Sequence, residues 1–361
     1  MAETAVIGVI GGSGLYNMPE ISDKVSVTVS TPFGSPSGSI VIGTLRGKRV
    51  AFLPRHGEGH TLLPSEVPYR ANIYALKSLG VRFIIAANAC GSLTESYRPG
   101  HLALPDQLYD NTRSERGGRT FFGEGIVGHV SMADPFSPEL SGVIARAAAA
   151  QVPDAVIHRG GLFVVIEGPR FSTRGESRTY RAWGGQLIGM TTAPEAFLAN
   201  EAEIAYAAIA HITDYDVWHE SEEPVTTEIV MATMAKNIDH VQRVIAAAVE
   251  RLDVNADYAA HHTLDNVVMT ARARSRGDGG QAQAAAWRAA RPGDVRRCRV
   301  KPSLAESQSS RGCRRAYPTG HRRPVRRRQP RRTQYSARSR LARLGADPRL
   351  DRGGGWRPPC A

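Results

Sequence analysis

Apolar residues within the first 270 positions form short runs that are rich in β-branched side chains. Runs of this kind, bounded by glycine, proline or aspartate, are typical of buried strands. The predicted strands are Ala5–Ile10, Arg49–Leu53, Val81–Asn88, Leu162–Ile166 and Ile209–Tyr215. Two more runs on either side of a Pro- and Gly-rich turn predict antiparallel strands, Val25–Ser30 and Ser39–Leu45.

Between these runs, apolar residues recur every three or four positions, which is the period of an amphipathic helix. This pattern predicts helices over Tyr69–Leu79, Pro138–Gln151, Ala193–Ala208 and Thr226–Leu252. Strands that alternate with helices are typical of an α/β fold. We therefore expect a single α/β domain with a central mixed sheet flanked by helices.

The composition of the chain changes near Thr270. The formal net charge is +12, but residues 271–361 hold 25 of the 46 Lys and Arg residues and 5 of the 34 Asp and Glu residues. Residues 1–270 are therefore mildly acidic, with 21 basic and 29 acidic residues. We expect a catalytic domain over residues 1–270. The Arg-, Gly- and Pro-rich segment 271–361 has too little apolar periodicity to form a packed core.

The arginine-rich segment has two interpretations. A basic segment can contact nucleic acid through the phosphate backbone. Its 24 arginines and single lysine, mixed with Pro, Gly and Ala, also match a GC-rich gene read out of frame. We favour a disordered or artefactual segment over a nucleic-acid-binding tail.

Cysteine usage and hydropathy narrow the class of protein further. Cys90 is the only cysteine before residue 271, and no spacing predicts a zinc site or a disulfide framework. The N-terminus lacks the basic region of a signal peptide, and no run approaches the roughly 20 apolar residues of a membrane span. We expect a cytoplasmic protein with no membrane contact.

Three polar motifs follow predicted strands in the first hundred residues. Gly11-Gly12-Ser13-Gly14 offers backbone N–H groups and a hydroxyl that suit a phosphate, although a turn for tight packing explains it equally well. Arg55 and His56 place a cation and an imidazole at a strand end, where α/β sheets bind ligands. Asn88-Ala89-Cys90-Gly91-Ser92 is a third such corner, with Cys90 a small buried apolar residue rather than a nucleophile.

Three later motifs have the same placement. In the segment 167–174, Phe171 could stack on a flat heterocycle or belong to the core. Met190 and Thr191 could contact a sugar and an anion, or be a core methionine and a helix cap. Asp214 and Asp216 are two residues apart at a strand end, so one carboxyl could raise the pKa of the other; such a pair is otherwise a solvated loop.

The order and spacing of these motifs resemble one family. The matching segments are GGSG, PRHG at 54–57, VPYRANIYALKSLGV at 67–81, NACGSL at 88–93, IEGPRFSTRGES at 166–177, GMTTAPEA at 189–196 and TDYDVW at 213–218. Together they resemble the 5'-methylthioadenosine phosphorylases of the trimeric purine nucleoside phosphorylase family. The resemblance covers roughly residues 5–270, and the arginine-rich segment has no counterpart in it.

The resemblance implies a role for each matched position. Phosphate would be held by Ser13, Arg55, His56, Asn88, Ala89 and Thr191. Ribose and purine would be held by Met190, Phe171, Asp214 and Asp216, with His129 supplied near the 5' position by a neighbouring subunit of a homotrimer. Specificity for the base and the 5' substituent would rest on Ser172, Thr227 and Val230.

The implied reaction is phosphate-dependent cleavage of 5'-methylthioadenosine to adenine and 5-methylthioribose 1-phosphate, in purine and methionine salvage. Asp214 and Asp216 would be catalytic: Asp214, protonated, donates to purine N7, and Asp216 accepts from the N6 amine. Inorganic phosphate is a co-substrate, and no metal or organic cofactor is required.

Three positions depart from the residue most common in the family, and they keep an alternative open. Ser13 and Asn88 stand where methylthioadenosine enzymes often have threonine, and Thr227 stands where valine is common. A broader purine nucleoside phosphorylase acting on adenosine or 6-oxopurine nucleosides is therefore the second interpretation.

A nicotinamide-dependent oxidoreductase is an alternative from another class, because it would explain the glycine turn after the first strand. It requires an acid at the end of the second strand, about 20 residues on. Glu20 and Asp23 precede that strand instead, so the pattern fits poorly.

Overall fold

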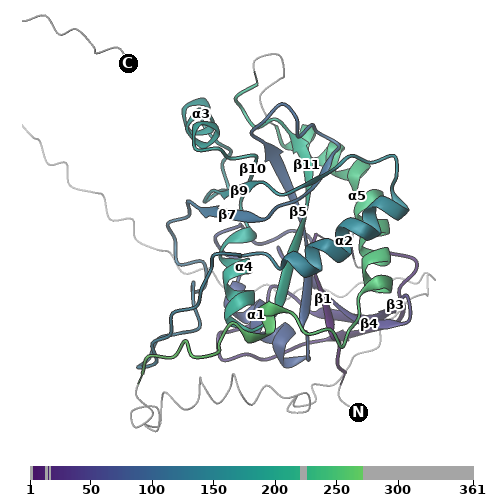
Figure 1. The fold of residues 1–361 in the computed structure, drawn as a ribbon, viewed down its shortest axis with the longest axis vertical. Coiled ribbons are helices and arrows are strands. Elements are labelled where there is room, and N and C mark those ends of the chain that lie inside the picture. The colour runs from purple at the N-terminus through teal and green to yellow at the C-terminus, as the bar shows by residue number, and fades with distance from the viewer. Residues whose placement is uncertain (1–2, 13–14, 16–17, 220–225, 271–361) are drawn as a thin grey trace, which may run out of the picture. The chain divides into compact units, whose positions relative to one another are not determined.

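A computed structural model describes residues 3–12, 15, 18–219 and 226–270, and it has an α/β fold (Figure 1). Ser13 and the segment 271–361 lie outside these described residues. Strands of the described residues form one 11-stranded sheet. They are β1 Ile7–Gly11, β2 Ser22–Val27, β3 Ile40–Leu45, β4 Lys48–Pro54, β5 Phe83–Ser92, β6 Leu102–Leu104, β7 Gln107–Asp110, β8 Ile157–Arg159, β9 Leu162–Val165, β10 Leu187–Gly189 and β11 Ala205–Asp214.

The sheet is mixed, as the sequence predicts. Strand β5 lies at its centre and pairs in parallel with β1 and with β11. The carboxyl end of β5 also pairs with β10, in the antiparallel direction. Strands β2, β3 and β4 form an antiparallel extension, as predicted around the Pro- and Gly-rich turn. The bounds of β3 differ from the prediction by one residue, whereas β2 begins and ends three residues before the predicted Val25–Ser30.

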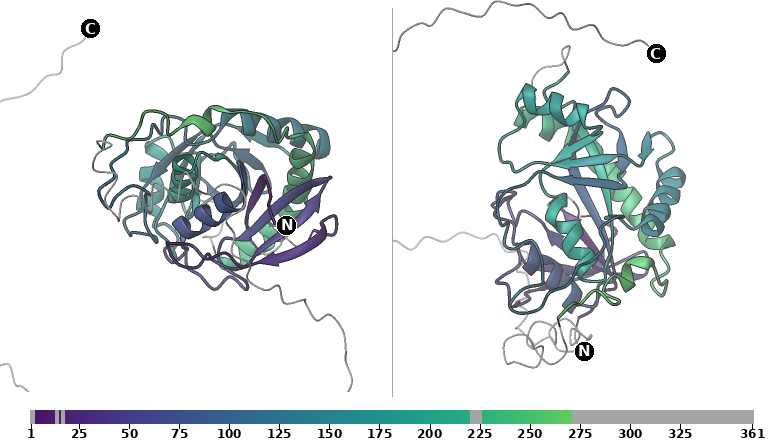
Figure 2. Two further views of the ribbon diagram at one scale, coloured as in Figure 1. Left: turned by 90° about the horizontal axis from the view of Figure 1, so that it is seen from below. Right: turned by 60° about the vertical axis from the view of Figure 1, so that its left-hand side comes forward.

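Helices cover both faces of the sheet. They are α1 Tyr69–Ser78, α2 Pro138–Gln151, α3 Arg174–Ala182, α4 Thr192–Glu201 and α5 Thr227–Arg251, with a short 3-10 helix at Ala259–His262. Ile85 on β5 belongs to the core cluster that contains α2 and α5, whereas its neighbour Ile84 belongs to the cluster that contains α1 and α4. Successive strand residues point to opposite faces, so a continuous apolar run is the expected sequence of a strand with helices on both sides. Figure 2 shows these two helix layers from two further sides.

The predicted helix Ala193–Ala208 is wrong in its second half. Helix α4 ends at Glu201, and β11 begins at Ala205. The alanine-rich segment around Tyr206 fits both patterns, but pairing with β5 buries every residue of β11 and satisfies its backbone. Tertiary pairing therefore overrides the helix propensity of alanine.

Helix α3 was not predicted. Its N-terminus is a capping box: the Thr173 hydroxyl accepts from the Glu176 N–H, and the Glu176 carboxylate accepts from the Thr173 N–H. This Thr-x-x-Glu spacing was the signal in the sequence that could have found the helix. Among the described residues, none of the helices is long and apolar enough to cross a membrane.

Candidate active site

The carboxyl ends of β4, β1 and β5 meet at one edge of the sheet, because these strands are parallel neighbours. Arg55 follows β4, and its backbone N–H donates to the Gly11 carbonyl at 3.0 Å. Asn88 and Ala89 lie on β5, and Thr191 follows β10. The tertiary fold thus brings together motifs that are separated by more than a hundred residues in the chain.

Arg55 is buried and paired. Its guanidinium forms a bidentate salt bridge with the Glu195 carboxylate, with Nε and Nη2 each 2.8 Å from a carboxylate oxygen. Its Nη1 donates to the Ala87 carbonyl at 2.9 Å. The Tyr206 hydroxyl donates to Glu195 Oε1 at 2.8 Å, so the carboxylate is itself held in place.

Electrostatics favour a permanently charged Arg55. Burial alone would lower the pKa of its guanidinium, but the Glu195 carboxylate outweighs burial and raises that pKa. A planar guanidinium fixed by three hydrogen bonds keeps its remaining N–H groups in one direction, which suits recognition of a planar or tetrahedral anion.

His56 lies beside Arg55 and is neutral near pH 7. Burial, with the charge of Arg55, lowers the pKa of this imidazole to about 4. Its Nδ1 lies 2.8 Å from the Leu62 carbonyl, so Nδ1 carries the proton. The ring stacks on His60 with 4.3 Å between ring centroids. Nε2 is then an acceptor, and it can hydrogen-bond a protonated oxygen of an anion.

Asn88 and Thr191 are joined across β5 and β10. The Asn88 amide Nδ2 donates to Thr191 Oγ1 at 3.2 Å, while Asn88 Oδ1 is buried without a hydrogen-bond partner among the described residues. Thr191 occupies the N-cap position of α4, but its hydroxyl does not cap the helix. Ala89 is the one exposed residue of β5. Asn88 and Thr191 therefore lie close to the N-terminus of α4, and the N-terminus of a helix is a favourable place for an anion.

Asp214 and Asp216 form a pair of buried carboxyls at the end of β11. The Asp214 carboxyl accepts the Asp216 N–H at 2.8 Å and the Thr213 hydroxyl at 2.6 Å. A side chain at Gly91 would place its Cβ 2.7 Å from Asp214 Oδ1, so the neighbouring strand needs glycine there. Asp216 has a left-handed backbone, with φ of 52°, which ends the strand.

Both aspartates hold their protons more tightly than usual. Burial raises the pKa of Asp214, and burial together with the charge of Asp214 raises the pKa of Asp216. The hydroxyls of Ser177 and Ser172 lie close enough to Asp216 to oppose this increase, although neither reaches hydrogen-bond geometry. Asp216 Oδ2 is buried without a hydrogen-bond partner in the described part of the chain. The two aspartates are therefore buried carboxyls rather than solvated loop acids.

The segment that follows β9 lies against Met190, the residue that follows β10. A Cβ at Gly168 would lie 2.7 Å from Met190 Sδ, so glycine lets this segment approach the methionine. Met190 is half-buried and packs against the cluster that includes Ile166 and Trp218. Phe171 has 37% of its surface exposed, so it is available for stacking and is not a core residue.

Three residues named from the sequence have no hydrogen bond or ion pair to these groups within the described residues. Thr227 is exposed and Val230 half-buried, both in the first turn of α5. His129 is exposed, and its backbone N–H donates to the Val267 carbonyl at 3.1 Å. No hydrogen bond or ion pair within the described residues links His129 to Arg55 or Asp214.

Sequence reasoning missed three buried polar residues. Glu195 lies within the motif GMTTAPEA but was not assigned, Arg116 lies on a loop, and His211 lies on β11. Burial, with the charge of Arg55, lowers the pKa of His211 to about 4. Its Nδ1 has no hydrogen-bond partner among the described residues. Histidine in an otherwise apolar strand was the available signal for His211.

Comparison with known proteins identifies the family. Residues 6–250 match the model of the phosphorylase superfamily. The curated S-methyl-5'-thioadenosine phosphorylase of Chloroflexus aurantiacus is 52% identical, with 74% of this chain and 92% of that protein covered. That of Gloeobacter violaceus is 51% identical, with 72% of this chain and 87% of that protein covered.

Solved structures show the same likeness. A methylthioadenosine phosphorylase from an antarctic soil metagenomic library has a TM-score of 0.75 at 46% identity, with 79% of this chain and 99% of that chain covered. The methylthioadenosine phosphorylase of Schistosoma mansoni, in complex with adenine, has a TM-score of 0.64 at 39% identity, with 68% of this chain and 91% of that chain covered.

An α/β sheet with Arg55, Asn88 and Thr191 near one edge and a buried carboxyl pair is the setting of the match over residues 6–250, which defines the class as the phosphorylase superfamily. Within that class, identity near 50% over nearly the full length of the curated relatives is decisive. The chain belongs to the S-methyl-5'-thioadenosine phosphorylase family.

Proposed function

We propose that the side chains at these strand ends carry out the reaction of the family. The chain is a pentosyltransferase that cleaves 5'-methylthioadenosine with inorganic phosphate, as its relatives at 52%, 49% and 51% identity indicate. The products are adenine and 5-methylthioribose 1-phosphate. The observation that carries the assignment of residues is the convergence of Arg55, Asn88 and Thr191 at one edge of the sheet.

Phosphate binds at this edge in our proposal. Arg55 supplies the fixed positive charge, Thr191 and Ser13 supply hydroxyls, and the backbone at Ala89 supplies an N–H group. His56 Nε2 accepts a hydrogen bond from the remaining P–OH group of the phosphate. Glu195 is a positioning residue, because it holds the Arg55 guanidinium at two points. Together these groups hold phosphate beneath the anomeric carbon of the ribose.

The purine binds at the other end of the site. Asp214 acts as the proton donor to N7 while negative charge develops on the departing base. Burial raises the pKa of this carboxyl, which favours its protonated form. Asp216, whose Oδ2 is free of other hydrogen bonds in the described chain, accepts from the N6 amine. Phe171 stacks on the base, Met190 covers the ribose, and Ser172 borders Asp216.

We further propose that the 5' end of the nucleoside lies against α5. Thr227 and Val230 would face the substituent, and the exposed His129 would be supplied by a neighbouring copy in a homotrimer. The catalytic domain would span residues 1–270 in the cytoplasm. Segment 271–361 is assigned no part in catalysis.

Adenosine is a second candidate substrate. The Schistosoma mansoni protein is also described as an adenosine/methylthioadenosine phosphorylase, and structures exist of its variants in which a serine and an asparagine are each replaced by threonine. Ser13 and Asn88 are the same two residue types, at positions where the family often has threonine. This parallel favours acceptance of a 5'-hydroxyl in addition to a 5'-methylthio group.

Release of the base from methylthioadenosine, adenosine, inosine and methylthioinosine, with and without phosphate, tests the proposal. We expect release from methylthioadenosine only when phosphate is present. Arg55→Ala should raise the KM for phosphate by more than it raises the KM for the nucleoside. Base release by the wild type without phosphate would identify a hydrolase and refute the mechanism.

A further inference from the structure

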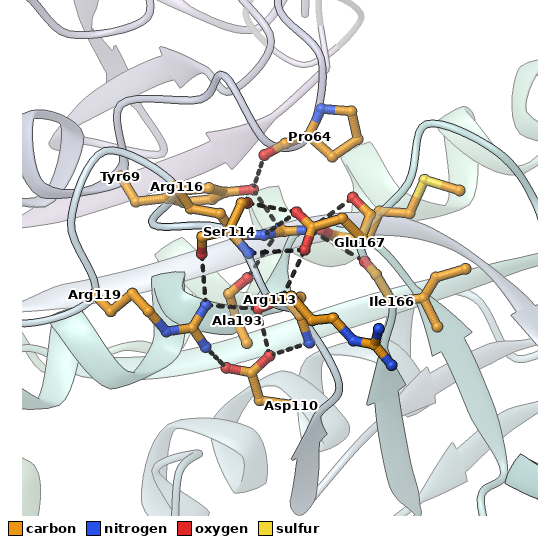
Figure 3. A network of polar contacts seen from close by, with 12 residues as sticks. Pro64, Tyr69, Asp110, Arg113, Ser114, Arg116, Arg119, Ile166, Glu167 and Ala193 are labelled. Carbon is orange, nitrogen blue, oxygen red and sulfur yellow. Dashed lines mark hydrogen bonds and ion pairs between the residues drawn. The ribbon is translucent and has the colours of Figure 1, made fainter.

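Arg116 is a buried arginine that the reaction described above does not use. It lies on the loop between β7 and α2, in a left-handed backbone conformation with φ of 48°. Its side chain has no exposed surface. Figure 3 shows the guanidinium between two segments that follow different strands, one around Glu167 and one around Ala193.

The guanidinium donates mainly to two backbone carbonyls at strand ends. Nη1 lies 2.6 Å from the Met190 carbonyl, just after β10, and Nη2 lies 2.7 Å from the Glu167 carbonyl, just after β9. Longer contacts reach the carbonyls of Ala193 at 3.3 Å and Ile166 at 3.2 Å. One planar group therefore spans the ends of two neighbouring strands.

Side-chain contacts fix the orientation of the guanidinium. The Tyr69 hydroxyl accepts from Nη1 at 3.3 Å and donates to the Pro64 carbonyl at 2.9 Å. The Glu167 carboxylate lies 3.3 Å from Nε. That carboxylate also accepts from the backbone N–H groups of Arg113 and Ser114, so the loop that carries Arg116 is tied to the end of β9.

The two bridged segments carry substrate-binding residues in our assignment. The segment after β9 leads to Phe171, and the segment after β10 contains Met190 and Thr191. Strands β9 and β10 pair up to Gly189 and Val165, and the carbonyls beyond that point need other donors. A buried carbonyl left without a donor lowers the stability of the fold by about 1–3 kcal/mol. Removal of the planar Arg116 guanidinium, which donates to both segments, would therefore let the two segments shift.

We propose that Arg116 is a positioning residue, which sets the distance between the Phe171 segment and the Met190–Thr191 corner so that ribose and phosphate meet correctly. The proposal rests on the assignment of those residues to substrate. Arg116 makes no hydrogen bond or ion pair to Asp214 or Asp216 within the described residues. It therefore governs binding geometry and leaves the proton donor unchanged.

The test is Arg116→Lys, a variant that keeps the charge but loses the planar fork. A displacement of about 1 Å in a catalytic site costs about a hundredfold in rate. We expect kcat/KM for methylthioadenosine to fall by about this factor, with KM raised for both nucleoside and phosphate. The pH dependence of kcat should match that of the wild type.

Arg119→Lys is the matched control. Arg119 lies on the same loop, but it contacts Asp110 at the end of β7, Thr112 and the Ser114 carbonyl rather than the carbonyls that follow β9 and β10. Its replacement should leave both KM values within about twofold of wild type. If Arg116→Lys does not fold, Tyr69→Phe removes one anchor of the guanidinium and should raise both KM values by a few-fold at an unchanged pH profile.

Three outcomes would overturn the proposal. Wild-type kinetics in Arg116→Lys would show that the fork is dispensable. A lower melting temperature with normal kinetics per folded molecule would reduce Arg116 to a structural role. A fall in kcat with a shifted pH profile and unchanged KM values would show that Arg116 acts on Asp214 and Asp216 rather than on the binding geometry. The wild type is measured in the same assay. If it does not release adenine from methylthioadenosine in the presence of phosphate, the proposed function is wrong. If it does, a difference between wild type and variant reports on Arg116.

Discussion

Replacement of Glu195 by glutamine should destabilise the protein in a way that phosphate reverses. The Arg55 and Glu195 side chains are 4% and 1% exposed, so their ion pair is almost fully removed from water. Loss of one partner of such a pair leaves a buried charge without compensation, at about 3–5 kcal/mol. Glutamine keeps one oxygen, which can accept from Tyr206 and from one Arg55 N–H group. We therefore expect a loss near the lower limit, about 3 kcal/mol.

Phosphate supplies the negative charge that the variant lacks. Urea denaturation followed by circular dichroism, with and without phosphate, measures both effects. The unfolding free energy of Glu195→Gln should be about 3 kcal/mol below that of wild type in phosphate-free buffer, and the difference should shrink as phosphate is added. By the same linkage the folded variant should bind phosphate more tightly than the wild type does, because Glu195 no longer balances the charge of Arg55. The value of kcat should fall, because the Arg55 guanidinium is no longer held at two points.

Glu201→Gln is the control on the same helix. Glu201 is also buried, but it accepts from the Thr120 hydroxyl and the Phe121 N–H rather than from the Arg55 guanidinium. Its replacement should not change the response to phosphate. Equal unfolding free energies for wild type and Glu195→Gln, or a deficit that phosphate leaves untouched, would refute the role of Glu195.

Three other predictions follow from the site and the sequence. The pKa of His211 falls from 6.5 in the unfolded chain to about 4 in the fold. As pH falls, His211 is therefore protonated in the unfolded chain before it is protonated in the folded one. The free energy of unfolding should fall by about 3 kcal/mol between pH 6.5 and pH 4. His211→Leu should remove that part of the acid sensitivity in urea titrations at pH 7 and 4.5, and equal sensitivity in both proteins would contradict the assignment. In the wild type, kcat/KM for methylthioadenosine should exceed that for methylthioinosine by roughly tenfold or more. Asp214→Asn and Asp216→Asn should lower kcat for methylthioadenosine and reduce this ratio. An unchanged ratio of the two kcat/KM values would show that the pair is not in the site. A chain of residues 1–270 should keep the kcat/KM and melting temperature of residues 1–361, and a large loss would assign a function to the arginine-rich segment.

Elements with a strong local pattern agree with the sequence prediction. Helix α2 has the predicted bounds, because Ser137 caps it, Pro138 opens it and its apolar period is regular. The strand that precedes Arg55 differs from its prediction by one residue at each end, β4 being Lys48–Pro54. The alanine-rich run was assigned wrongly because alanine suits a helix, while the partner strand that stabilises β11 is more than a hundred residues away.

The sequence by itself determined which polar motifs lie at strand ends, because polar residues after buried strands are a local pattern and parallel strands place their ends together. It did not determine which partners those residues take. Arg55 and Glu195 are 140 residues apart, and only the packing of α4 against the sheet makes them an ion pair. The raised pKa of Asp214 is likewise a consequence of burial. Pairing and desolvation depend on distance and on exclusion of water, and both are properties of the folded chain.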